Sequence, residues 1–178
     1  MDYSKIIERY YRKNAGLFKI LVNHSADVTR KALDIAERHP ELNLDRRFVE
    51  EAAMVHDIGI FKTHAPSIRC FGREPYLRHG VIGAELMRQE GYPAHARVCE
   101  RHTGTGLTKE EIVAQQLPLP HVDLIPESME EQVICFADCF FSKTKLGSEK
   151  SVEDIHRKVQ KFGVRSLKQF DDWCAMFL

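Results

Sequence analysis

The stretch AAMVHDIGIFK, residues 52–62, is the part of the sequence on which both the fold and the chemistry depend. It begins as an apolar helical segment and then places His56 and Asp57 side by side, followed by Gly59. A charged aspartate at the end of an apolar segment is costly to bury unless another group compensates its charge. Histidine nitrogen and carboxylate oxygen together suit a divalent first-row metal. By itself the pair is consistent with a metal site and, equally, with a helix end capped by a carboxylate.

The segments on both sides of this stretch have the hydrophobic periodicity of amphipathic helices. Residues 17–36 place their apolar side chains along one stripe, and Asp45 can cap the helix that leads into residue 55. Residues 60–77 contain two prolines and a glycine, so a loop is expected there. Further helices are expected over 79–91, 93–102, a short segment from 108, 128–144, about 151–162 and about 166–177, with a surface loop over 116–128. The sequence therefore predicts an all-α protein, a compact bundle of seven to nine helices that forms one domain over residues 1–178.

Composition narrows the class of protein. Of the 178 residues, 43% are hydrophobic and 29% are charged, which is typical of a soluble globular protein. Lysine plus arginine equals aspartate plus glutamate at 26 each, so the balance of charge does not favour dedicated nucleic-acid binding or membrane association. The five cysteines form no CxxC pattern and are expected to be reduced thiols, and no apolar run approaches the ~20 residues of a membrane span. A cytoplasmic location is expected.

Four residues outside the opening stretch extend the set of possible ligands. His24 lies on the apolar stripe of its helix, a position that by itself is more often filled by a core histidine than by a metal ligand. His79 begins a helix, His102 ends the next one, and Asp138 lies in the apolar run VICFADCFF. No arginine or lysine lies within one helical turn of Asp138, and Lys143 is expected to point elsewhere on the same helix.

The order H…HD…H…H…D, with HD extended to HDIG, resembles the HD superfamily of metal-dependent phosphohydrolases in its HDIG branch, over about residues 20–145. The resemblance implies a dinuclear site in which Asp57 bridges two ions. The implied ligands of one ion are His24, His56, Asp57 and Asp138, and those of the other are Asp57, His79 and His102. Asp57, His79 and His102 are also the implied catalytic residues. The donor set suits one or two divalent ions of iron, manganese, zinc, nickel or cobalt.

The activity implied by the resemblance is hydrolysis of a phosphoester by metal-activated hydroxide. The expected partner is a nucleotide or another small phosphorylated molecule, and a phosphomonoesterase and a phosphodiesterase are equally open. The family also leaves open a di-iron oxygenase of the same fold and a non-catalytic, ligand-sensing HD module. The sequence does not indicate the oligomeric state.

The expected loop after Asp57 is rich in cations. Lys62, Arg69 and Arg73 are predicted to bind the anionic substrate, because arginine binds phosphate through paired hydrogen bonds. The alternative is a solvated loop whose charges face water. Four other histidines have no partner in the ligand pattern and are expected at the surface or in loops: His39, His95, His121 and His156.

Overall fold

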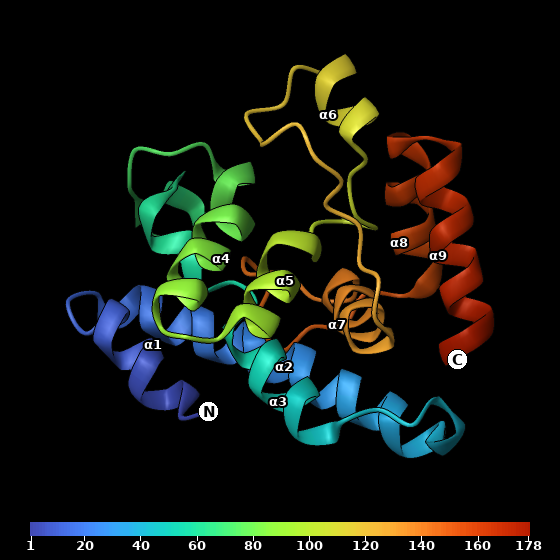
Figure 1. Cartoon of the computed structure of the whole chain (residues 1–178), viewed down its shortest axis with the longest axis horizontal. Coiled ribbons are helices and arrows are strands. Elements are labelled where there is room, and N and C mark those ends of the chain that lie inside the picture. The colour runs from blue at the N-terminus through green and yellow to red at the C-terminus, as the bar shows by residue number, and fades with distance from the viewer.

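A computed structural model describes residues 1–178, and the chain is almost entirely helical (Figure 1). The α-helices are α1 (Tyr3–Tyr11), α2 (Ala15–Arg38), α3 (Arg46–Val55), α4 (His79–Gln89), α5 (Pro93–Arg101), α6 (Lys109–Ala114), α7 (Met129–Cys139), α8 (Val152–Val159) and α9 (Val164–Phe177). The short 3-10 helices are η1 (Pro40–Leu42), η2 (Ile58–Lys62), η3 (Pro66–Ile68), η4 (Tyr76–Arg78) and η5 (Gln160–Phe162). Two strands, β1 (His64–Ala65) and β2 (Cys70–Phe71), pair antiparallel. The predicted all-α fold with seven to nine helices is confirmed.

Local capping fixes several helix starts where the sequence predicted them. The Asp45 carboxylate accepts a hydrogen bond from the backbone N–H of Phe48 at the start of α3. Thr108 and Glu111 form a complete capping box at the start of α6. These side chains satisfy backbone donors that a helix end otherwise leaves without a partner.

Two regions differ from the prediction. Residues 60–77 contain the small β-hairpin and three 3-10 helices, where an irregular loop was expected. Helix α7 ends at Cys139, not at residue 144. Beyond that point the Lys150 ammonium donates to the carbonyl oxygens of Cys139 and Phe141, at 2.8 Å and 2.6 Å, so a side chain takes the carbonyls that a continuing helix would have used.

The buried side chains form two large clusters, and the site residues lie where these clusters meet. One cluster joins α3, α7, α8 and α9 to the second half of α2, and the other joins α1, α4, α5 and η2 to its first half. On α2, Leu21 belongs to one cluster and Val28 to the other, with His24 between them. Likewise, Ala53 and Val55 near the end of α3 belong to different clusters, just before the HD pair.

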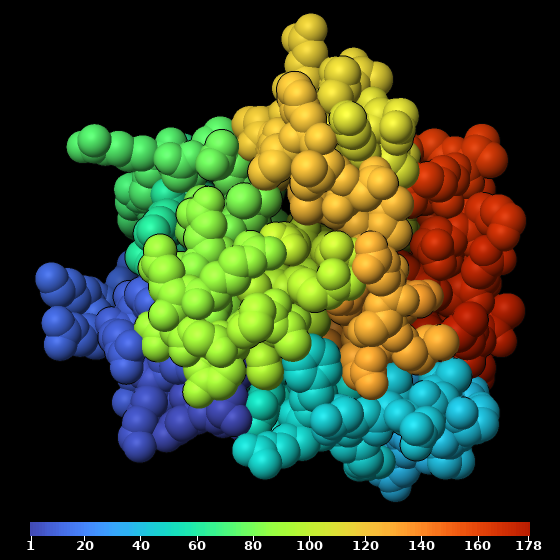
Figure 2. Space-filling view, in the orientation of Figure 1, coloured from blue at the N-terminus to red at the C-terminus, as the bar shows by residue number.

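The C-terminal helices and the segment containing α6 form one side of the molecule. Figure 1 shows α8 and α9 side by side, with the α6 segment extending beside their upper ends. In Figure 2 residues 103–128 project beside α9, away from the body formed by the N-terminal half. None of the helices combines the length and the apolarity needed to cross a bilayer.

Candidate metal centre

Asp57 lies at the centre of the cluster, and its two carboxylate oxygens face different histidines. The residue directly follows the helical part of the opening stretch, and its side chain is completely buried. Its Oδ2 lies 3.1 Å from His24 Nε2 and 3.2 Å from His56 Nε2. Its Oδ1 lies 3.4 Å from His79 Nε2 and 3.5 Å from His102 Nε2. One carboxylate is therefore shared between two sets of nitrogen donors.

Asp138 completes the first set. Its Oδ1 lies 2.9 Å from His24 Nε2 and 3.6 Å from His56 Nε2. The structure thus brings together all six residues that the sequence suggested as ligands, in two groups that share Asp57. In each group the donor atoms lie within 4.8 Å of one another; the groups are His24, His56, Asp57, Asp138 and Asp57, His79, His102. The division between the groups is the one that the resemblance implied.

Three of the histidines are held in the orientation of metal ligands by their own helix ends. In each ring Nδ1 contacts the backbone carbonyl oxygen three residues earlier: His56 to Ala53 at 2.6 Å, His79 to Tyr76 at 2.7 Å, and His102 to Cys99 at 2.7 Å. A carbonyl oxygen only accepts hydrogen bonds, so in the neutral ring Nδ1 carries the proton and Nε2 keeps a lone pair. A backbone carbonyl on the second ring nitrogen is a common support for histidines that bind metals.

The donor atoms also fit a cation because the protein leaves them without hydrogen-bond partners. Both carboxylate oxygens of Asp57 and the Nε2 atoms of His24 and His56 are buried and make no hydrogen bond of good geometry, although Lys143 forms an ion pair with Asp57 Oδ2. Buried polar atoms without partners are rare because each costs free energy. A divalent transition ion in each group would satisfy them with nitrogen and oxygen ligands.

The two carboxylates are held in the ionised form. Burial by itself would raise the pKa of Asp57, but the charges of Lys143 and His56 hold it well below its usual range. Burial would also raise the pKa of Asp138, but its close contacts with His24 and His56 hold it well below its usual range. Ionised carboxylates are the form that binds metal.

The histidine environments differ between the two groups. Burial would lower the pKa of His56, yet the neighbouring Asp57 and Asp138 raise it to about 10. Burial dominates at His79 and lowers its pKa to about 3, so this ring is neutral at ordinary pH. A metal entering the first group therefore replaces a proton on His56, whereas the His79 nitrogen is already free to bind.

Lys143 corrects a prediction. It was expected to point away from Asp138 on a continuing helix, but α7 ends at Cys139 and the chain turns back. Its Nζ lies 2.5 Å from Asp57 Oδ2, and its side chain is only 11% exposed. Burial lowers the pKa of Lys143, but the two carboxylates outweigh this effect and hold it above its usual range. No glycine or proline lies between Asp138 and Lys143 to mark the end of the helix, so the sequence carried no local signal for this contact.

Gly59 determines how closely the second group approaches the first. A Cβ atom at this position would lie 2.2 Å from the His79 carbonyl oxygen and 2.5 Å from the Gly83 backbone nitrogen. Both contacts are to backbone atoms, which cannot rotate away. Only glycine therefore allows η2 to pack against the first turn of α4, and this packing positions His79.

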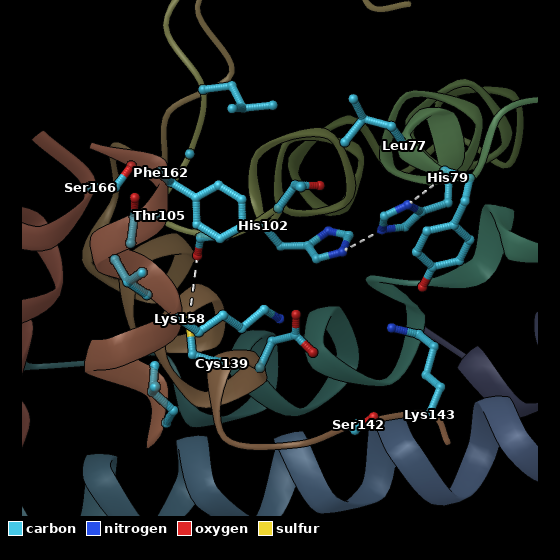
Figure 3. A pocket seen from close by; sticks show the side chains of 18 of the residues that line it. Leu77, His79, His102, Thr105, Cys139, Ser142, Lys143, Lys158, Phe162 and Ser166 are labelled. Carbon is cyan, nitrogen blue, oxygen red and sulfur yellow. Dashed lines mark hydrogen bonds between the residues drawn. The ribbon is translucent and has the colours of Figure 1, made fainter. Parts of the chain in front are cut away.

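A cavity of about 570 Å³ opens on the cluster (Figure 3). Asp138, His79 and His102 line one end of it, and the cations among its lining residues are Lys143, Lys150 and Lys158. The predicted substrate-binding residues Lys62, Arg69 and Arg73 are exposed and are not among the lining residues. Their binding of the substrate therefore stays a prediction.

The other histidines lie mainly where the sequence suggested. His121 is exposed, and His39 and His156 are half-buried beside Glu41 and Asp171 at the surface. His95 is the exception, since it is buried with Nε2 3.3 Å from Glu51 Oε2. Its position on the inward face of α5, between α3 and the N-terminus, accounts for the difference.

The geometry of this cluster agrees with a comparison of the whole sequence. The family model for the HD domain matches residues 21–141, which include all six candidate ligands. The chain belongs to the HD domain family. As an HD domain protein, it has a cluster of histidines and aspartates that could hold divalent metal.

Curated relatives show a similarity over most of this HD domain protein. It is 33% identical over 143 residues to a tRNA (cytidine(56)-2'-O)-methyltransferase of Picrophilus torridus, covering 80% of this chain and 37% of that protein. A methyltransferase of the same name in Thermoplasma volcanium is 33% identical over 144 residues, which cover 80% of this chain and 38% of that protein. An uncharacterized protein of Methanocaldococcus jannaschii is 32% identical over 144 residues, which cover 79% of this chain and 76% of that protein. The aligned part of the chain thus spans little more than a third of either methyltransferase. No solved structure matches it significantly.

Proposed function

We propose that this protein is a metal-dependent phosphohydrolase that acts on a nucleotide or another small phosphorylated molecule. The observation that carries the proposal is the division of Asp57 between two donor groups at the end of a cavity that also contains lysines. Two divalent ions bound side by side supply Lewis-acid activation of water and neutralisation of phosphoryl charge.

The residues have separable roles in this proposal. His24, His56 and Asp138 would hold one ion, His79 and His102 would hold the other, and Asp57 would serve both groups. The carbonyl contacts at Nδ1 keep the rings from rotating, so the protein presents its ligands already oriented. The enclosing helices keep the ligand nitrogens and Asp57 away from bulk water, which strengthens their interaction with charge.

Two lysines are placed to hold the phosphoryl group. Figure 3 shows Lys143 and Lys158 extending into the cavity from opposite sides. Lys143 is the cation beside Asp57, and with metal in the site its ammonium would be available to face an anion in the cavity. Lys158 comes from α8 and would approach the same anion from the far side.

A nucleotide is favoured over other phosphorylated molecules by the relatives. Two of them carry names that describe modification of tRNA, and they contain a region similar to this chain. The HD region of such a protein would act near nucleotides. This support is independent of the ligand geometry.

Metal analysis combined with a phosphate-release screen tests the proposal. We expect anaerobically purified protein to hold nearly two transition-metal ions per chain and to release phosphate from at least one mononucleotide, dinucleotide or cyclic nucleotide. Asp57→Asn should lose metal from both groups and all turnover. Asp34→Asn, at an exposed site on α2, is the matched control and should retain both.

Other outcomes identify the competing activities. Full phosphate release by Asp57→Asn would refute the site assignment. Oxygen consumption by a di-iron form, with no phosphate released, would indicate the oxygenase. Nucleotide binding without metal and without turnover would indicate a sensing module.

A further inference from the structure

The far wall of the cavity is formed by residues that follow the segment matched to the HD family. That segment ends at residue 141, whereas the cavity continues to α8, η5 and α9. The lining residues of this wall are Lys150, Ile155, Lys158, Val159, Phe162 and Ser166. The part of the cavity farthest from the ligands is therefore built by this chain's own C-terminal helices.

Charge is distributed unevenly along the cavity. Lys143 and Lys158 point into it, but the other nearby cations are already paired. The Lys150 ammonium is bound to two backbone carbonyls at the end of α7. Arg165 on α9 binds both carboxylate oxygens of Glu111 at 2.8 Å. Lys158 is thus the one cation of the far wall without a partner, whereas Phe162, Thr105 and Ser166 carry no charge and together suit an uncharged group.

An aromatic ring and an unpaired hydroxyl stand at this far end. Phe162 lines the cavity and is 60% exposed, so its ring offers a free apolar face. Thr105 is only 3% exposed, and its Oγ1 makes no hydrogen bond. Figure 3 shows Phe162, Thr105 and Ser166 together on one side of the cavity, across from His79. A buried hydroxyl without a partner is costly, and a ligand with a polar edge would remove that cost.

We propose that this far end, defined by Phe162, Thr105 and Ser166, binds the base of a nucleoside whose phosphate lies at the metal centre. The base stacks on Phe162, and a polar atom at its edge bonds to Thr105 Oγ1. A bare sugar phosphate would leave the Phe162 ring uncovered, and an alkyl phosphate would leave the Thr105 hydroxyl unpaired. The phosphate half of this inference rests on the proposed function, whereas the base half rests only on the far end.

Calorimetric titration with adenosine tests the base site without any phosphate. Wild-type protein, as purified with its metals, should bind adenosine, and Phe162→Ala should weaken binding on the order of tenfold, the usual effect of losing one base–aromatic stack. Thr105→Val, which keeps the shape and removes the hydroxyl, should weaken it several-fold. Phe71→Ala is the matched control, because Phe71 is 72% exposed on β2 and lies outside the cavity.

Kinetics separates the base site from the phosphohydrolase. If adenosine monophosphate is hydrolysed, Phe162→Ala should raise its KM about tenfold with little change in kcat, and should leave ribose 5-phosphate hydrolysis unchanged. If adenosine binding depends on Phe162 but no substrate releases phosphate, the base site is supported and the phosphohydrolase activity is refuted. Three results would overturn the base site. They are equal adenosine affinity in wild type and Phe162→Ala, no adenosine binding to wild type at millimolar concentration, and tighter binding of octyl phosphate than of adenosine monophosphate.

Discussion

Replacing Gly59 by alanine is expected to remove one metal ion from the proposed dinuclear centre and leave the other in place. The added Cβ would lie 2.2 Å from the His79 carbonyl oxygen, whereas ordinary contact begins at 3.4 Å. The difference of 1.2 Å must open between η2 and the first turn of α4. Because His79 is the first residue of that helix, its ring moves with the backbone.

The size of this shift decides which ion is lost. His79 Nε2 lies 3.4 Å from Asp57 Oδ1 and 3.0 Å from His102 Nε2, and metal sites tolerate deviations of only about 0.2 Å in ligand distance. The three atoms nearest to the added Cβ all belong to α4, whereas the other group takes its remaining ligands from α2, the end of α3 and α7. Overpacking of this kind also costs about 1–3 kcal/mol of unfolding free energy.

Elemental analysis of anaerobically purified protein measures the outcome. The ratio of metal to chain should fall from near two to near one, and urea unfolding should report a loss of about 2 kcal/mol. Gly83→Ala in the same interface is the control, because its Cβ would meet Cys99 Cβ at 3.3 Å and needs only a small adjustment. Two ions and unchanged stability in Gly59→Ala would refute the reasoning. Equal losses in the two variants would show that the interface is merely sensitive to volume.

Three further predictions concern charge, pH and capping. Lys143→Met should lower the unfolding free energy of the metal-free protein by roughly 3 kcal/mol in urea titrations, because it leaves the buried carboxylates without their cation. The loss should be smaller once metal is bound, and an equal loss with and without metal would contradict this explanation. Lys145→Met, at an exposed site, is the control and should change neither value. Burial lowers the pKa of His95 below its ordinary 6.5, so the unfolded chain takes up the proton first and stability falls as the pH drops below about 6.5. His95→Asn should therefore lose less stability than wild type between pH 7.5 and 5.5, and equal losses would count against a buried neutral ring. Thr108→Ala should cost about 1 kcal/mol in the same assay through loss of the capping box, and no change would show that α6 does not depend on it.

Much of the fold and the gathering of the six candidate ligands were predictable because the signals are local. Apolar periodicity marked the helices, and Asp45 and Thr108 marked two of their starts through hydrogen bonds that span only three residues. A carboxylate in an apolar run, as at Asp138, indicated a compensating partner wherever that partner lay. The chain order of the ligands then limited which histidines could be that partner.

The substrate-binding role of the loop after Asp57 stays a prediction, and its cations lie outside the lining of the cavity. Nearness in sequence to Asp57 suggested that Lys62, Arg69 and Arg73 would face the ligand, yet the hairpin of β1 and β2 leaves all three exposed. Exposed cations are stable in water without any partner. Their presence in a sequence therefore says little about where they point.

The sequence by itself determined the helical class and the set of candidate ligands, since both depend on residue type and spacing along the chain. Only the tertiary structure decided which oxygen of Asp57 faces which histidine, that Lys143 returns to the same carboxylate, and that the C-terminal helices close the cavity around Phe162. These features depend on where α4, α7 and α8 pack. Packing is decided by the fit of whole helix faces, such as the contact of Gly59 with α4, and no local pattern encodes it.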